Sequence, residues 1–153
     1  MGLKLIKILE TDCYFGGKYL KYRNNVLIAE VYIVTLKQKN AGFEYVLLAD
    51  TTGAIIERAY HYLNVKLQYA QQSTREHATV ALKIFYSFIE LMDIVDYEQI
   101  GWAEHTQLTQ FLFGGIISGN SLIMQLGKQR SRKTVNIYMG VYRDFFRTYV
   151  KDN

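Results

Sequence analysis

The sequence contains few of the residues on which metal and disulfide sites depend. Among its 153 residues there are no prolines, one cysteine and three histidines. A single cysteine, Cys13, excludes an intramolecular disulfide framework and a multi-cysteine zinc site. The histidines, His61, His77 and His105, form no His-x-x-x-His pair. We therefore expect no bound metal.

Long apolar runs are also missing. No stretch approaches the length of about 18 apolar residues that a membrane-spanning helix needs. The N-terminal segment, MGLKLIKILETD, carries charges within its apolar run, which does not fit a signal peptide. Half of the residues are nevertheless hydrophobic, which is typical of a folded chain. We expect a cytoplasmic protein of one ordinary domain or two small ones, without membrane contact.

The sequence has no recognisable catalytic motif. It lacks the Gly-x-x-x-x-Gly-Lys phosphate loop and the Gly-x-Ser-x-Gly nucleophile elbow. The glycine pair in FGGK, from Phe15 to Lys18, does not have phosphate-loop spacing, and Cys13 has no basic neighbour that would activate it. We therefore predict that the chain has no catalytic residues of its own and no cofactor.

Charge is unevenly distributed along the second half of the chain. No lysine or arginine lies between Lys83 and Lys128, whereas five acidic residues fall there. No acidic residue lies between His105 and Arg143, and cations accumulate there. The densest cluster places Lys128, Arg130, Arg132 and Lys133 within six residues. An acidic segment is thus followed by a basic one, although two solvated surface patches would give the same pattern.

The hydrophobic periodicity predicts an α+β protein. Residues 1–50 read as a β region, with a short strand at LKLIKIL and a hairpin that pairs Val26–Leu36 with Phe43–Ala49 through the turn KQKNAG. From residue 51 the period changes to that of helices. We place the boundary between a β subdomain, 1–50, and a helical subdomain, 51–153, near Ala49 to Gly53.

Four helices are predicted in the helical subdomain. The first has an apolar stripe of Ile56, Ala59/Tyr60, Leu63, Leu67 and Ala70. The second begins with Ser73 as N-cap and Glu76 at the capping-box position, and continues through Ala81, Ile84/Phe85, Phe88 and Leu91/Met92. The third runs from about Trp102 to Ile117, with Leu108, Phe111 and Leu112 facing inward. The fourth starts at Ser131, with the stripe Val135, Tyr138, Val141/Tyr142, Phe145 and Tyr149.

The basic cluster lies directly before the fourth helix. A helix N-terminus already carries partial positive charge, so four further cations require compensation. An external anion is one candidate, because backbone N–H groups, the hydroxyls of Ser131 and Thr134 and the cations together suit phosphate. A smaller set of the same kind, Ser73, Thr74, Arg75 and His77, starts the second helix, where simple capping and solvent exposure are the alternative.

The serial order of these motifs resembles the core-binding domain of tyrosine recombinases, the phage-integrase superfamily. The segments that carry the resemblance are STREHATVALKIFYSFIELM, YEQIG, LTQFLFG and SRKTVNIYMGVYRDFFRTYV, and it covers about residues 50–150. In the last segment the matching residues are Ser131, Thr134, Val135, Asn136, Val141, Tyr142, Arg143, Phe145 and Phe146. Each motif has low specificity alone, and the order in which they follow one another is more specific.

The resemblance implies a small, orthogonal four-helix bundle of the SAM-like type that clamps double-stranded recombination-site DNA. The family's catalytic domain, with its Arg, Lys, His-x-x-Arg and nucleophilic Tyr, is absent from this chain, so we expect a non-catalytic fragment of a recombinase, associated with a bacterial nucleoid. Phosphate contacts are expected from Lys128, Arg130, Arg132, Lys133 and Thr134, and base-edge or phosphate contacts from Arg75, His77, Thr79 and Asn136. Self-association with other protomers on DNA is a further expectation.

Two questions stay open on the sequence alone. Residues 1–50 are consistent with an accessory DNA-binding sheet, with a strand-pairing surface, or with an embellishment packed on the first helix. The whole chain is also consistent with a protein-interaction domain that does not bind DNA. In that alternative the acidic segment pairs with the basic segment of a neighbouring copy, and the hairpin edge recruits another strand.

Overall fold

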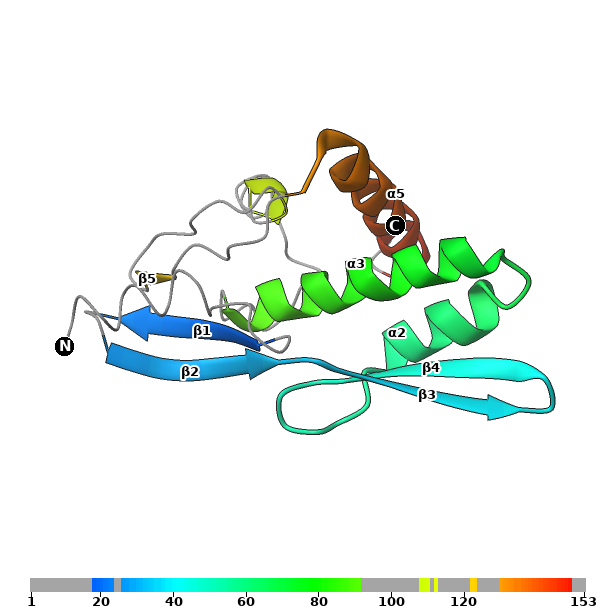
Figure 1. The fold of residues 1–153 in the computed structure, drawn as a ribbon, viewed down its shortest axis with the longest axis horizontal. Coiled ribbons are helices and arrows are strands. Elements are labelled where there is room, and N and C mark those ends of the chain that lie inside the picture. Colours follow the sequence, from blue (N-terminus) through cyan, green and yellow to red (C-terminus); the bar gives the residue numbers. More distant parts are fainter. Residues whose placement is uncertain are drawn as a thin grey trace. The chain divides into compact units, whose positions relative to one another are not determined.

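The computed structural model describes residues 18–23, 26–91, 108–110, 112, 122–123 and 130–149, which form an α+β protein (Figure 1). The chain divides into two compact units. The first comprises Met1–Tyr32 and Ser87–Val135, and the second comprises Ile33–Tyr86 and Asn136–Asn153. The subdomain boundary near residue 50 stays a prediction, and the strand expected at LKLIKIL lies outside the described residues.

The first unit contains a three-stranded antiparallel sheet. Strand β1 (Lys18–Arg23) lies between β2 (Val26–Tyr32) and the two-residue strand β5 (Leu122–Ile123). The β1–β2 register shifts between Lys21 and Tyr22, which marks a bulge. Of the third predicted helix, residues 108–110 and 112 are described. They are helical, and Leu108 and Leu112 are buried as predicted, whereas Phe111 lies outside the described residues.

The predicted hairpin is present in the second unit, with different bounds. The expected strand Val26–Leu36 is divided at Ile33, so β2 pairs with β1, and a separate strand, β3 (Val34–Asn40), pairs with β4 (Phe43–Ala49). The turn is also tighter than the predicted KQKNAG. Ala41 and Gly42 alone connect the strands, with φ of 54° and 83°. Two successive positive φ values give the right-handed twist that a two-residue hairpin needs.

The first predicted helix is shorter than its apolar stripe suggested. Helix α2 (Glu57–His61) continues directly into a π-helical turn, η2 (Tyr62–Lys66), in which the N–H of Leu67 bonds the carbonyl of Tyr62 at 3.0 Å. The wider turn changes the phase of the helix. It buries Tyr62, Leu63 and Asn64 in succession, so Ala70 lies beyond the helix and outside the stripe.

Helix α3 (Gln72–Leu91) begins before the predicted cap. The N–H of Arg75 bonds the carbonyl of Gln71 at 3.1 Å, which makes Gln71 the N-cap residue and places Ser73 inside the first turn. The predicted capping box of Ser73 with Glu76 is therefore wrong; Glu76 instead accepts a hydrogen bond from the Gln72 amide at 3.3 Å. The predicted apolar stripe is confirmed where it is described, since Ala81, Ile84, Phe85 and Phe88 are all buried.

The core of the second unit is largely aromatic. Helix α5 (Arg132–Tyr149) contributes Tyr142 and Phe145, whose side chains are 1% and 0% exposed. The Phe145 ring packs edge-on against Tyr62 at 5.4 Å between centroids, and the Tyr142 hydroxyl donates to the Ala81 carbonyl at 2.8 Å. Phe146, which the periodicity places beside this stripe, is half-buried against Phe85 at 5.2 Å.

Candidate nucleic-acid interface on helix α5

Helix α5 begins at the residue that the sequence predicted. The hydroxyl of Ser131 accepts a hydrogen bond from the N–H of Thr134 at 3.2 Å, and its carbonyl accepts from the N–H of Val135 at 2.9 Å. This is N-cap geometry, which satisfies orphan donors of the first turn. Thr134, predicted as a phosphate contact, uses its hydroxyl as acceptor from the Ser131 hydroxyl at 3.1 Å.

The two sides of α5 differ sharply in chemistry. The predicted stripe is buried at Val135, Tyr138, Tyr142 and Phe145, while Val141 and Tyr149 are half-buried. The opposite side is exposed at Arg132, Lys133, Asn136, Arg143 and Arg147, a set that we name the basic face. At 100° per residue these five positions fall within an arc of about 100°, so they project from one surface of the helix.

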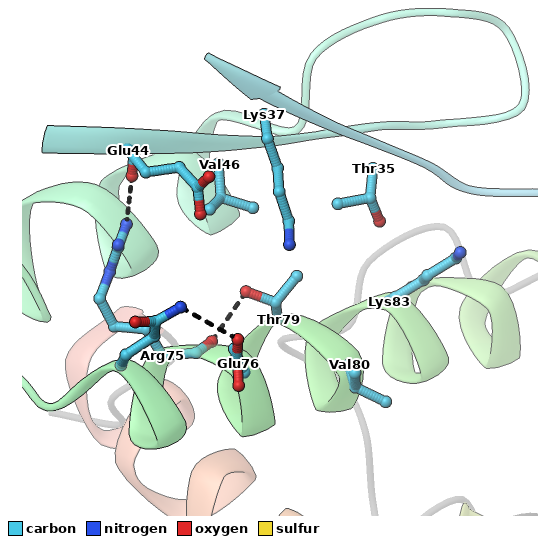
Figure 2. Close-up of a pocket in the computed structure, with 10 residues that line it drawn as sticks. Thr35, Lys37, Glu44, Val46, Arg75, Glu76, Thr79, Val80 and Lys83 are labelled. Atoms are coloured by element: carbon cyan, nitrogen blue, oxygen red, sulfur yellow. Dashed lines mark hydrogen bonds between the residues drawn. The ribbon is translucent and has the colours of Figure 1, made fainter. Parts of the chain in front are cut away.

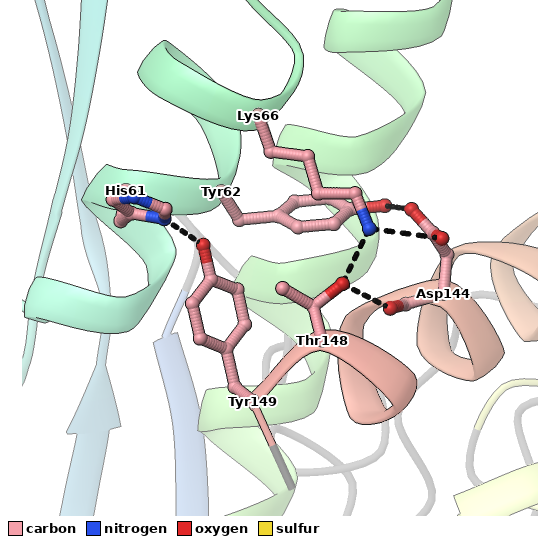
Figure 3. A network of polar contacts seen from close by, with 6 residues as sticks. All are labelled: His61, Tyr62, Lys66, Asp144, Thr148 and Tyr149. Atoms are coloured by element: carbon pink, nitrogen blue, oxygen red, sulfur yellow. Dashed lines mark hydrogen bonds and ion pairs between the residues drawn. The ribbon is translucent and has the colours of Figure 1, made fainter. Parts of the chain in front are cut away.

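The only acidic residue of α5, Asp144, is neutralised by the helix beside it (Figure 3). One carboxylate oxygen accepts from the hydroxyl of Tyr62 at 2.6 Å, and the other accepts from the ammonium of Lys66 at 3.2 Å. Lys66 also donates to the Thr148 hydroxyl, and the neighbouring His61 ring contacts the Tyr149 hydroxyl. The charge of Asp144 is thus engaged on the η2 side.

The ionisation of this cluster follows from its contacts. Burial, the largest single influence on Asp144, acts to raise its pKa, but the hydrogen bonds from Tyr62 and Lys66 and the charges of Lys66 and Arg147 together lower the pKa below its ordinary value. Burial and the carboxylate beside it raise the pKa of Tyr62 well above the usual range. At neutral pH, Tyr62 is therefore a protonated donor and Asp144 an anion.

Within the described ranges, no ion pair involves Arg132, Lys133 or Arg143. Gly140 lies next to this surface, and a Cβ built there would meet the guanidinium of Arg143 at 3.8 Å. With Asp144 turned toward Lys66, four cations and the Asn136 amide remain on the exposed side of one helix. That combination suits a polyanion with regularly spaced charges.

The remaining cluster residues lie in different settings. Arg130 is half-buried and donates from its guanidinium to the carbonyl of Leu112 at 3.2 Å, so part of its donor capacity is used within the protein. Lys128 lies outside the described residues. Arg132 and Lys133 are exposed in the first turn of α5.

The residues predicted on the second helix are less available than those on α5. Arg75 donates to the carbonyls of Leu63 and Glu44, both at 3.0 Å, and to the side-chain oxygen of Asn64 at 3.2 Å. Its guanidinium also lies over the ring of Phe43, 4.6 Å from the centroid. These contacts give Arg75 a role in holding β4 against η2, and its DNA contact stays a prediction.

On α3, His77 follows Arg75 by about half a turn and Thr79 follows it by about one turn. Thr79 is 8% exposed and its hydroxyl donates to the Arg75 carbonyl at 2.8 Å, while His77 is exposed. Neither is on α5, and their DNA contacts stay predictions.

Arg143 and Arg147 are absent from the site residues predicted from the sequence. Those predictions follow the dense cluster at the start of the helix, whereas the helical period continues the same exposed surface to Arg147, about three turns beyond Asn136. Asn64 was also not predicted to have a role, although it is a polar residue among the apolar positions of the first helix and is 3% exposed. A polar residue within an apolar stripe is the signal that could have indicated it.

Among the described residues, no group of three or more metal-ligating side chains lies together, and no helix has both the length and the apolarity to cross a membrane. The comparisons with known proteins identify no relative, since no family model, no curated protein and no solved structure matches the chain.

Proposed function

We propose that this chain is the DNA-binding, non-catalytic module of a site-specific tyrosine recombinase and that the basic face of α5 binds the duplex. The observation that carries the proposal is the sidedness of α5. Its aromatic stripe is buried, its one carboxylate is engaged by Tyr62 and Lys66, and its exposed arc presents four cations with an amide between them. Cations on one rigid helix can follow a row of phosphates.

The family assignment rests on the motif order described above. The helices α2 with η2, α3 and α5, together with the helical residues 108–110 and 112, follow one another in the sequence positions of the proposed four-helix, SAM-like bundle. In this proposal the parent protein cleaves and joins DNA strands through a separate catalytic domain, and this chain supplies half of the clamp. Self-association occurs between recombinase protomers on DNA.

The proposal is tested by duplex binding at several salt concentrations, followed by fluorescence anisotropy. If four phosphates are neutralised, a plot of log K against log salt concentration should have a slope of about −3.6. In the double variant Arg143→Gln, Arg147→Gln the slope should become shallower, about −1.8, because two phosphate contacts are removed. Glutamine retains helix propensity and side-chain length.

The matched control is Lys37→Gln, Lys39→Gln, which removes the same net charge from exposed positions of β3. We expect this control to keep at least most of the affinity and the original slope. Equal losses in the two double variants would mean that binding follows net charge alone, and the assignment to α5 would then be abandoned.

The alternative function, a protein-interaction domain without direct DNA binding, draws on a different feature, the outer edge of β3, which could bind another strand whether or not α5 binds DNA.

A further inference from the structure

The two outer edges of the β3–β4 hairpin are treated differently by the protein. On β4, the side-chain amide of Asn64 accepts from the N–H of Val46 and donates to its carbonyl, both at 2.8 Å. One side chain thus takes the place of a neighbouring strand at Val46. The carbonyls on either side along this edge, of Glu44 and Leu48, accept from the Arg75 guanidinium and from the N–H of Ile56.

These contacts fix which backbone groups of β3 face outward. Glu44, Val46 and Leu48 direct their backbone groups away from β3, so the residues opposite them form non-hydrogen-bonded pairs. Those opposite residues are Lys39, Lys37 and Thr35. Their own N–H and C=O groups therefore point to the outer edge, and within the described ranges none of these groups has a partner.

The two faces beside this edge differ in chemistry. Thr35 and Lys37 point toward α3 and line a pocket of about 340 Å³, together with Val46, Thr79 and Val80 (Figure 2). The Lys37 side chain extends into this space and makes no ion pair among the described residues. The acidic residues that line the pocket are Glu44, which lies opposite Lys39, and Glu76, which is bonded to Gln72. On the other face, Leu36 is 49% exposed.

We propose that the outer edge of β3 binds an extended segment of a partner protein in which acidic and apolar side chains alternate. Backbone hydrogen bonds to Thr35, Lys37 and Lys39 would add the segment as a further strand. Because side chains of a strand alternate between faces, a carboxylate beside Lys37 places the next side chain beside Leu36. The acidic residue would pair with the ammonium of Lys37, and the apolar residue would cover the exposed Leu36.

A second copy of this chain is a poor occupant of the same edge. Two β3 strands paired antiparallel through all three outward residues place Lys37 directly opposite Lys37 of the other copy. Like charges in that position destabilise a strand pair. An acidic segment has the opposite effect, and charge therefore selects the partner.

The test uses amide hydrogen exchange of the full chain, measured by NMR. The probe is an end-blocked peptide of about eight residues that alternates valine and glutamate. At saturation we expect exchange at the outward amides of Thr35, Lys37 and Lys39 to slow by at least about tenfold. The amides of Leu36 and Gln38, which already bond β4, serve as the internal control and should change little.

Two further peptides test the specificity of the site. An alternating valine–lysine peptide should bind at least about tenfold more weakly because it meets Lys37 with like charge. A peptide with the same valine and glutamate content in a non-alternating order should lose most of the protection, because it cannot present each kind of side chain to its own face.

Variants of the protein separate the edge from general charge effects. Lys37→Glu should weaken binding of the valine–glutamate peptide at least about tenfold, whereas Lys133→Glu, which makes the same charge change on α5, should not. Thr35→Pro removes one outward N–H and leaves the ladder to β4 intact. It should also weaken binding, and unchanged chemical shifts away from β3 would show that this variant is folded.

Three results would overturn the proposal. The first is an absence of protection at the outward amides at millimolar peptide. The second is protection that rises with protein concentration in the absence of peptide, since that would make a second copy the occupant. The third is protection of the same amides by duplex DNA. The proposal does not depend on DNA binding by α5, because Arg143→Gln, Arg147→Gln should leave peptide affinity unchanged.

Discussion

Asn64 is a buried polar residue whose side chain takes the place of a neighbouring strand at the edge of β4. It is 3% exposed, and its amide group bonds both backbone groups of Val46, the Tyr60 carbonyl and the Arg75 guanidinium. An amide has two donors and an acceptor in one plane, and can therefore replace a strand neighbour. Closing the β4 edge in this way leaves β3 as the open side of the hairpin.

Asn64→Ala should therefore destabilise the protein strongly. The substitution leaves the N–H and C=O of Val46 without partners in a buried position, at about 1–3 kcal/mol for each unsatisfied group. We expect a loss of about 3 kcal/mol in the free energy of unfolding, measured by urea denaturation. Thr52→Ala, which removes an exposed hydroxyl bonded to Asp50, is the comparison and should cost less than about 1 kcal/mol. A similar cost for the two would contradict the strand-mimic role.

Asp144 should make stability depend on acid pH. Its pKa is lowered in the folded protein, so its contribution is fully present above the ordinary carboxyl pKa and is lost as pH falls through the folded value. Below that range the stability curves of the native chain and of Asp144→Asn should converge, while near neutral pH the native chain should be more stable. Thermal melts from about pH 7 to about pH 2 measure both curves. Parallel curves would mean that the carboxylate is not stabilised by Tyr62 and Lys66.

At the scale of elements, hydrophobic periodicity predicted which helices and strands are present better than it predicted where each begins and ends. The stripes of α3 and α5 are long and regular, so their buried positions followed from spacing alone. Two features do not follow a single period. The π turn at Tyr62–Lys66 inserts a change of phase, and the division at Ile33 interrupts one apolar run that reads as a continuous strand. Both depend on tertiary partners, Asn64 with β4 in one case and β1 with β2 in the other.

The candidate site, like the elements, could be predicted only where it depends on local sequence. Local charge density indicated the start of α5, where Ser131 caps the helix as expected. The availability of each cation is a tertiary property. Sequence does not tell that Arg75 is turned toward β4, that Arg130 reaches the Leu112 carbonyl, or that Lys66 engages Asp144.

The hairpin turn contains a residue that is unfavourable for its conformation. Ala41 has a φ of 54°, in the left-handed region, where a residue with a Cβ is disfavoured by about 1–2 kcal/mol and asparagine is tolerated better. Ala41 is exposed, so the substitution touches no core contact. Ala41→Asn should raise the free energy of unfolding by about 0.5–1 kcal/mol, and Gly42→Ala at a φ of 83° should lower it by a similar amount. If neither substitution changed the free energy of unfolding, the turn would not have these two positive φ values.

At the scale of the whole molecule, the proposed function and stability oppose each other on α5. The chain carries a net charge of +4, and Arg143 and Arg147 lie four residues apart on the same helix face. Like charges at that spacing destabilise a helix by about 0.2–0.5 kcal/mol. Bound duplex DNA would place phosphates beside both arginines, so that the same two charges would then contribute attraction. A ligand that binds only the folded state stabilises it by about 2.7 kcal/mol at a hundredfold excess over Kd.

Arg143→Gln, Arg147→Gln should therefore affect the melting temperature mainly when DNA is present. Without DNA at low salt, the variant should melt close to the native chain, because the loss of repulsion between the two arginines is offset by the loss of attraction between Arg147 and Asp144. With saturating duplex DNA, the native chain should gain several degrees and the variant much less, and the difference should disappear as salt is raised, because screening weakens both repulsion and binding. Lys37→Gln, Lys39→Gln, measured in parallel, should retain the full DNA-dependent gain. If the α5 variant is less stable without DNA, the two arginines support the fold; if it keeps the native gain with DNA, the duplex binds elsewhere.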